Sequence, residues 1–252
     1  MRPSIDFNCD VGESFGPWRM GQDDALLPFA SSANIACGMH AGDPMVIQHT
    51  IGLCQQHGVA IGAHPGLPDL QGFGRRTLHM NATEIHAFVL YQVSALAGMA
   101  RASGAEVQHV KPHGALYHMA NEQAEVAAAI TDAIRDVSPT LKVYAQAQSR
   151  FAQIAQQRGL CVIEEAFAER RYEADGRLTP RDHPDAVIHD VDLAAQQVGQ
   201  LLVGDGLLAR TGERLRLRAD TICLHGDRPD ALEFARHLRQ AIEAAGWRVA
   251  AP

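Results

Sequence analysis

Polar side chains that could carry out chemistry gather in five short clusters, and each cluster follows a short apolar run. In chain order, the clusters contain Asn8, Asp10 and Glu13, then His40, then His64, then Lys111 and His113, and finally His225 and Asp227. Imidazole, carboxylate and ammonium groups are common general acids and bases, and imidazole with carboxylate also suits divalent metal ions. The clusters therefore predict acid–base or metal-assisted chemistry, provided that the fold brings them together.

Each of these residues also has a purely structural interpretation. A single histidine at the start of a loop is more often a capping or surface residue, and Asp10 could merely cap a turn with Gly12. Asp43, directly before Pro44, is expected to cap a helix. Lys111 is harder to explain in this way, because it is one of only two lysines in the chain. The joint occurrence of so many such residues favours a functional site.

The elements that must position these clusters alternate along the chain. Short apolar runs bounded by polar, Gly or Pro residues are typical of buried parallel strands, and the amphipathic stretches between them are typical of helices. Strands are expected at residues 4–9, 33–36, 60–63, 107–111, 142–145, 161–164 and 221–224. Helices are expected at residues 44–57, 82–103, 122–137, 148–158, 190–203 and 229–245.

Repeated strand–helix units predict a parallel sheet, because helical crossovers join parallel strands. About seven units in 252 residues favour one α/β domain over residues 1–252, a seven-stranded parallel β/α barrel. A doubly wound open sheet is the alternative. In a barrel, the C-terminal ends of all strands lie on one face, so the five polar clusters are expected to meet there.

Two connections are unusually long and are expected to act as functional loops or lids. The first spans residues 65–80 and carries Arg75 and Arg76 between glycines, where they could hold a carboxylate or a phosphate. A solvated arginine pair is the alternative. The second spans residues 166–189, contains Arg170, Arg171 and Arg181, and could close over the site.

Composition and missing motifs exclude several classes of protein. The formal net charge of −7 argues against nucleic acid as a partner. We expect no signal peptide and no membrane span, because no apolar run is long enough. The five cysteines form no Cys-x-x-Cys pair, which favours reduced thiols in the cytoplasm. The phosphate-binding loop of P-loop ATPases, the Gly-x-Ser-x-Gly elbow and the His-Glu-x-x-His zinc motif are all missing from the sequence.

Six motifs, in order, resemble those of the LamB/YcsF family, and the resemblance extends over nearly the whole chain. They are Asn-Cys-Asp-Val-Gly-Glu at 8–13, and further runs at 33–44, 62–76, 111–117, 167–178 and 224–227. The resemblance implies a barrel of the glycoside hydrolase/deacetylase type. It also implies the A subunit of a bacterial 5-oxoprolinase, which cleaves 5-oxo-L-proline to L-glutamate while ATP is hydrolysed to ADP and phosphate. Two further subunits, B and C, are implied as partners.

The roles of individual residues are hypotheses of our own. Asp10 is the candidate base, oriented by His64 or His225, and Lys111 would neutralise a developing oxyanion or phosphate. His113 or His40 could protonate the leaving nitrogen. The expected substrate-binding residues are Asn8, Glu13, His40, Arg75, Arg76 and Asp227.

Three alternatives remain open from the sequence. The first is a divalent metal held by Asp10, His40 and His64, although their spacing does not match the metal motif of the superfamily's deacetylases. The second is a metal-dependent deacetylase of an acetylated sugar. The third is a non-catalytic subunit that binds a lactam or a sugar for a partner enzyme.

Overall fold

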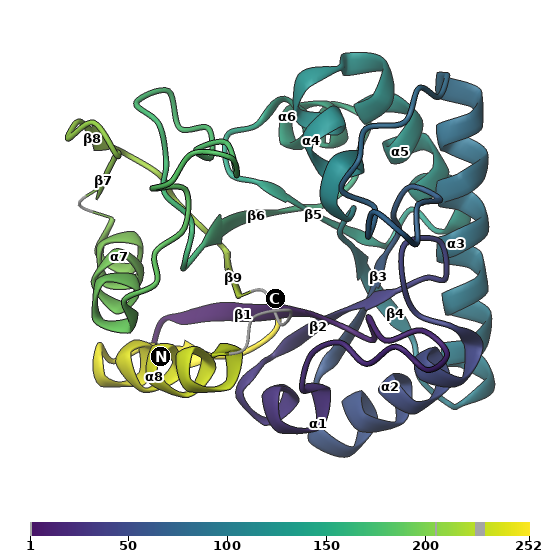
Figure 1. Ribbon diagram of the computed structural model, residues 1–252, viewed down its shortest axis with the longest axis horizontal. Coiled ribbons are helices and arrows are strands. Elements are labelled where there is room, and N and C mark those ends of the chain that lie inside the picture. The colour runs from purple at the N-terminus through teal and green to yellow at the C-terminus, as the bar shows by residue number, and fades with distance from the viewer. Residues whose placement is uncertain (1, 205, 225–229) are drawn as a thin grey trace.

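The computed structural model describes residues 2–204, 206–224 and 230–252. Seven parallel strands form a closed barrel in which each strand pairs with the next and the last pairs with the first (Figure 1). They are β1 (Ser4–Val11), β2 (Ser32–Ala36), β3 (Ala60–His64), β4 (Val107–Val110), β5 (Lys142–Gln146), β6 (Val162–Phe167) and β9 (Thr221–Leu224). The predicted seven-stranded parallel β/α barrel is therefore confirmed, and the open sheet is excluded.

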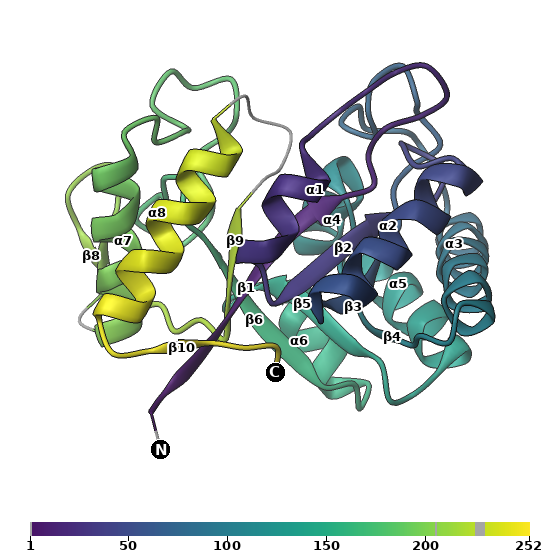
Figure 2. The same ribbon diagram turned by 90° about the horizontal axis from the view of Figure 1, so that it is seen from below.

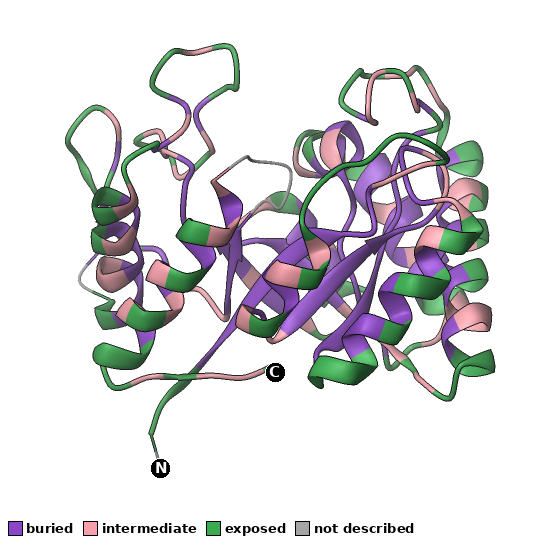
Figure 3. Ribbon diagram, turned by 60° about the horizontal axis from the view of Figure 1, so that its bottom comes forward, coloured by how far each residue is buried: buried purple, intermediate pink, exposed green. Residues whose placement is uncertain are grey.

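Helices surround the barrel on its outside (Figure 2). They are α1 (Asp23–Leu26), α2 (Pro44–His57), α3 (Ala82–Ala102), α4 (Gly114–Glu122), α5 (Ala124–Val137), α6 (Arg150–Gln157), α7 (Val191–Val203) and α8 (Ala231–Ala244), with a 3-10 turn at Leu27–Phe29. The Asp43 carboxylate accepts hydrogen bonds from the Met45 and Val46 amides, which confirms the predicted cap of α2. The apolar core lies between the strands and these helices (Figure 3).

Several elements differ from those that the sequence predicts. A short helix, α4, directly follows His113, and extended backbone at Gln123 separates it from α5. Strand β6 continues to Phe167 instead of ending at residue 164. Two short pairings were also not predicted: β7 (Leu207–Leu208) with β8 (Arg214–Leu215), and β10 (Arg248–Val249) with the start of β1. Among the described helices, none is both long and apolar enough to cross a membrane.

The barrel interior is polar, because alternate strand residues facing inward carry hydrogen-bonding groups. At its lower end, towards the N-terminal ends of the strands, the Asp6 carboxylate accepts four hydrogen bonds of 2.6–2.8 Å. The donors are Ser31, Ser32, Tyr144 and Thr221. Four donors satisfy this buried carboxylate, although burial still raises its pKa. The network ties β1, β2, β5 and β9 together beneath the site.

One layer higher, the His109 ring crosses the barrel and stacks on Tyr144, with ring centroids 4.0 Å apart. Its Nε2 lies 2.8 Å from Asn34 Oδ1. A Cβ on Gly62 would lie 2.0 Å from that nitrogen, so only glycine leaves room for the ring. Burial lowers the pKa of His109 to about 3, so the imidazole is neutral.

Candidate functional site

A pocket of about 950 Å³ opens at the C-terminal ends of the strands, the face on which parallel barrels carry their sites. The residues that line it come from β1, from the ends of β3 to β6, from α4 and from the loop that follows β6. Among them are Asp10, Glu13, His64, Arg75, Lys111, His113, Tyr117, Phe167 and Arg170. The fold thus brings together groups from clusters that lie far apart in the sequence.

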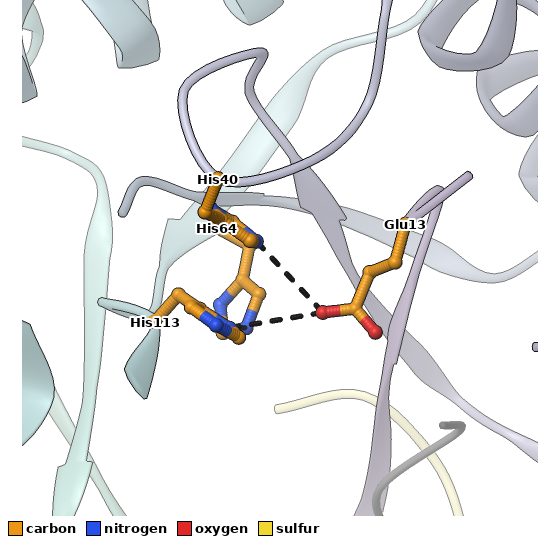
Figure 4. Close-up of side chains that lie close together, drawn as sticks. All are labelled: Glu13, His40, His64 and His113. Atoms are coloured by element: carbon orange, nitrogen blue, oxygen red, sulfur yellow. Dashed lines mark hydrogen bonds and ion pairs between the residues drawn. The ribbon is translucent and has the colours of Figure 1, made fainter. Parts of the chain in front are cut away.

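Four buried side chains in this region form a compact group: Glu13, His40, His64 and His113 (Figure 4). One ligand atom from each lies within 4.8 Å of the others. Glu13 Oε1 lies 3.8 Å from His40 Nε2 and 3.7 Å from His113 Nδ1. Each residue comes from a different segment, after β1, after β2, at the end of β3 and after β4, so only the closed barrel assembles the group.

Backbone carbonyls fix the orientation of two of these rings. His64 Nδ1 lies 2.7 Å from the Lys111 carbonyl oxygen, and His113 Nε2 lies 2.7 Å from the Phe73 carbonyl oxygen. A carbonyl only accepts, so these nitrogens carry the protons and the lone pairs lie on the opposite nitrogens. Those two, His64 Nε2 and His113 Nδ1, are 3.1 Å apart. Two lone pairs that face each other at this distance call for a cation or a proton between them.

His40 is the third imidazole of the group. It is 1% exposed, and its ring stacks on that of His113, with centroids 3.7 Å apart. Neither ring nitrogen has a hydrogen-bond partner among the described residues. Burial lowers the pKa of both His40 and His113 well below the ordinary value, with neighbouring imidazoles contributing. Neutral imidazoles are the form that binds a metal.

These donors fit a divalent metal ion. Three imidazoles and one carboxylate suit zinc and similar ions, whose bonds of about 2.0–2.2 Å place neighbouring ligands on the order of 3.3 Å apart. Carbonyls that hold the far nitrogens of ligand histidines are the usual outer support of such a site. The group contains His40 and His64 of the expected metal ligands and takes its carboxylate from Glu13. Asp10 lies beside it, with Oδ2 at 3.4 Å from His64 Nε2.

Lys111 lies below this group and is 3% exposed. Its ammonium lies 3.0 Å from Asp10 Oδ1, 2.8 Å from Glu165 Oε1 and 3.1 Å from Asn8 Oδ1. Burial alone would lower the pKa of Lys111, but Asp10 and other neighbouring groups raise it well above its ordinary value. Lys111 is therefore a fixed positive charge that holds the Asp10 carboxylate in place.

Other predicted site residues have different surroundings. Arg75 lines the pocket, with its guanidinium 5.1 Å from the centre of the Phe73 ring. Arg76 instead forms an ion pair with Asp69 inside the 65–80 loop, and it lowers the pKa of Asp69 to about 2. Asn8 lies below the pocket and donates to Glu165 and Thr221. Two further residues predicted for the site, His225 and Asp227, lie outside the described residues.

Sequence reasoning missed two residues of the site. Glu165 is fully buried, contacts Lys111, and accepts a hydrogen bond of 2.8 Å from the Tyr117 hydroxyl. Tyr117 comes from α4, and burial raises its pKa well above the ordinary value. Extending the period of two along β6 would have pointed Glu165 inward, but no sequence feature pairs it with Lys111.

A family model of the LamB/YcsF family matches residues 5–252. The chain belongs to the LamB/YcsF family. Its relatives include proteins named as the A subunit of 5-oxoprolinase in Bordetella pertussis, 51% identical over 251 residues and 100% of both chains, and in Methylococcus capsulatus, 51% identical over 100% of this chain and 96% of that one. The predicted resemblance is thus confirmed.

Solved structures agree with the assignment to the LamB/YcsF family. The lactam utilization protein of Thermus thermophilus is 42% identical and superposes with a TM-score of 0.95, over 99% of this chain and 100% of that one. A putative cellobiose-phosphate cleavage protein of Enterococcus faecalis reaches a TM-score of 0.59 at 11% identity, covering 99% and 97% of the chains. That second likeness shows a shared fold only.

Proposed function

We propose that the chain is the A subunit of a 5-oxoprolinase and holds the site at which the lactam amide of 5-oxo-L-proline is cleaved to L-glutamate. The assembled enzyme, with subunits B and C in the cytoplasm, couples this reaction to hydrolysis of ATP to ADP and phosphate. One observation carries the proposal: a metal-type group of three imidazoles and a carboxylate lies beside the Asp10–Lys111 pair in one pocket. The names of close relatives supply the substrate.

Amide hydrolysis needs an activated carbonyl, a base for water and a proton for the leaving nitrogen. A divalent ion held by Glu13, His40, His64 and His113 would act as a Lewis acid at the pocket floor. Because burial keeps His40 and His113 neutral, we assign them to metal binding and not to the role of general acid suggested by the sequence.

Asp10 is the proposed base. Its Oδ1 is held by the Lys111 ammonium at 3.0 Å and by the Asn34 amide at 2.8 Å, while its Oδ2 faces the histidine group. In this position the carboxylate takes a proton from the attacking water as the new C–O bond forms. It then gives that proton to the ring nitrogen as the C–N bond breaks, which balances the reaction. Lys111 stabilises the negative charge that develops nearby.

ATP enters the proposal because opening an unstrained five-membered lactam is unfavourable at neutral pH. Transfer of the terminal phosphoryl group to the lactam oxygen would release ADP and make the ring carbon electrophilic. Attack by one water and cleavage of the C–N bond would then leave the new carboxyl group as an acyl phosphate, which a second water would hydrolyse to glutamate and phosphate. The assembled enzyme is the proposed place of this coupling. The chain's own contribution is the pocket that positions the lactam next to Asp10.

The test is an Asp10→Asn variant, assayed for glutamate release after mixing with subunits B and C. We expect turnover to fall at least about 100-fold, the contribution of a positioned general base. Asp24→Asn, on an exposed carboxylate, is the matched control and should keep full turnover. Circular dichroism of both variants checks the fold. Normal turnover by a folded Asp10→Asn variant would leave the chain as a binding subunit for a partner enzyme.

The same metal-type group would also suit a metal-dependent deacetylase of an acetylated sugar. Release of acetate from acetylated sugars by the chain alone, without ATP, would favour that function over lactam cleavage. We expect no acetate release, because the relatives at about 50% identity are named for 5-oxoprolinase.

A further inference from the structure

The loop that follows β6 carries a buried arginine that the function proposed above does not use. Arg170 is 2% exposed, and its guanidinium donates to the Thr179 carbonyl at 2.6 Å and to the Ala186 carbonyl at 3.3 Å. Both acceptors belong to the same loop, which connects β6 with α7 at one side of the barrel (Figure 1). The carbonyls therefore fix the orientation of the guanidinium plane.

No carboxylate oxygen of the described residues lies within 4 Å of the Arg170 guanidinium nitrogens, and the more distant Glu169 carboxylate compensates its charge only in part, because the pKa of Arg170 is still lowered. Two of the other arginines that line the pocket form ion pairs: Arg210 with Glu173 at 2.9 Å, and Arg177 with Asp175 at 2.6 Å. Burial, and next the charge of Arg181, lower the pKa of Arg170 to about 10. A buried cation held only by neutral carbonyls is costly unless an anion joins it.

The position of Arg170 indicates which anion that is. Arg170 lines the same pocket as Asp10, Lys111 and His113, so it faces the cavity that the proposed catalytic groups also face. A guanidinium is planar and matches the two oxygens of a carboxylate with two parallel hydrogen bonds. Arg76, which the sequence also suggested for this role, is already neutralised by Asp69.

We propose that Arg170 binds the carboxylate of the lactam substrate and thereby sets the specificity for 5-oxoproline over uncharged lactams. The identity of the ligand rests on the function proposed above. That the ligand carries an oxyanion follows from the guanidinium alone, and a phosphoryl group would meet this requirement as well as a carboxylate. The experiment must therefore separate the substrate carboxylate from phosphate.

Binding is measured by calorimetry on the full-length chain at constant metal content, with 5-oxoproline, with 2-pyrrolidinone, which lacks the carboxylate, and with inorganic phosphate. We expect the unmodified chain to prefer 5-oxoproline to 2-pyrrolidinone by about 10- to 100-fold, the range for hydrogen bonds to a charged group. Arg170→Met should reduce this preference below threefold while leaving the affinity for 2-pyrrolidinone unchanged. Arg171→Met, on the neighbour that does not line the pocket, should keep the preference.

Because Arg170 also holds its loop together through hydrogen bonds to two carbonyls, Arg170→Lys provides a second variant. It keeps the positive charge but not the planar guanidinium with its parallel N–H donors. We expect this variant to fold and its preference for 5-oxoproline over 2-pyrrolidinone to fall at least threefold. If neither variant folds, the unmodified chain decides: equal affinity for the two lactams overturns the proposal, and a clear preference together with competition by acetate supports it. A preference that survives in a folded Arg170→Met variant also overturns it.

Loss of phosphate binding in Arg170→Met, with the lactam preference intact, would assign Arg170 to a phosphoryl group and overturn the carboxylate assignment. A chain that binds neither lactam would contradict the proposed function and the carboxylate assignment with it. A chain that binds both lactams equally would contradict the role of Arg170 alone.

Discussion

Replacing Lys111 with methionine removes the buried cation on which the barrel interior depends. The ammonium lies 3.0 Å from Asp10 Oδ1 and 2.8 Å from Glu165 Oε1, and the side chain is 3% exposed. Methionine keeps most of the length of the side chain but removes its charge. Two buried carboxylates then lose the positive charge that they share, and Asp10 also loses a hydrogen bond.

The expected loss of stability is large. Breaking a buried ion pair by removing one partner costs about 3–5 kcal/mol, because the remaining charge stays buried without compensation. Since two carboxylates share Lys111, we expect a loss of about 4–5 kcal/mol at pH 7. For a domain of this size, that corresponds to a fall in Tm of roughly 8–20 °C.

The free energy of unfolding is measured by urea denaturation followed by circular dichroism, at constant metal content. A double variant, Lys111→Met with Glu165→Gln, removes one of the uncompensated charges and should recover about 2 kcal/mol. Lys142→Met, at the only other lysine, is the control and should change stability by less than about 0.5 kcal/mol. If Lys111→Met unfolds at the same urea concentration as the unmodified chain, or if the double variant is the least stable, the reasoning about charge compensation is wrong.

Three further predictions concern the site and its supports. The purified chain should contain about one divalent metal ion, and His40→Gln should bind it at least about tenfold more weakly in a metal titration; an unchanged affinity would rule out His40 as a ligand. A Cβ on Gly66 would lie 2.3 Å from His40 Nδ1, so Gly66→Ala should cost about 1–3 kcal/mol in urea denaturation, whereas Gly52→Ala, with open space around it, should not destabilise the chain. Burial raises the pKa of Asp23 to about 6, so the stability that its protonated form contributes is complete below pH 4 and is lost as the pH rises through 6. Asp23→Asn should therefore be about 1–2 kcal/mol more stable than the unmodified chain at pH 7, and a gain that did not shrink towards pH 4 would contradict this origin.

The barrel and the position of its site could be predicted from the sequence because both depend on local patterns. Short apolar runs that alternate with amphipathic stretches indicate parallel strands with helical crossovers. The polar residues that follow those runs then have to lie on one face. This reasoning places Asp10, His64, Lys111 and His113 around one pocket, as the structure does.

The remaining features depend on contacts between distant residues. Arg75 and Arg76 look equivalent in the sequence, yet one lines the pocket and the other is neutralised by Asp69. The pair Glu164–Glu165 looks like the start of a loop, because a buried carboxylate only becomes reasonable once Lys111 lies across the barrel. The break between α4 and α5 falls at Gln123, where no glycine or proline marks it.

The His109 ring, which crosses the barrel, and the Asp6 network beneath it limit the ways in which a ligand can enter and leave the pocket. Apart from Ser31, these side chains are at most 1% exposed, and together they fill the barrel below Asp10 and Lys111. Over the described residues, the pocket is therefore closed towards the N-terminal ends of the strands and opens at their C-terminal ends. Under the proposed function, substrate would enter and the more highly charged, ring-opened product would leave by the same route, past Arg170 and its loop. A partner subunit docked over that opening would control both steps at once.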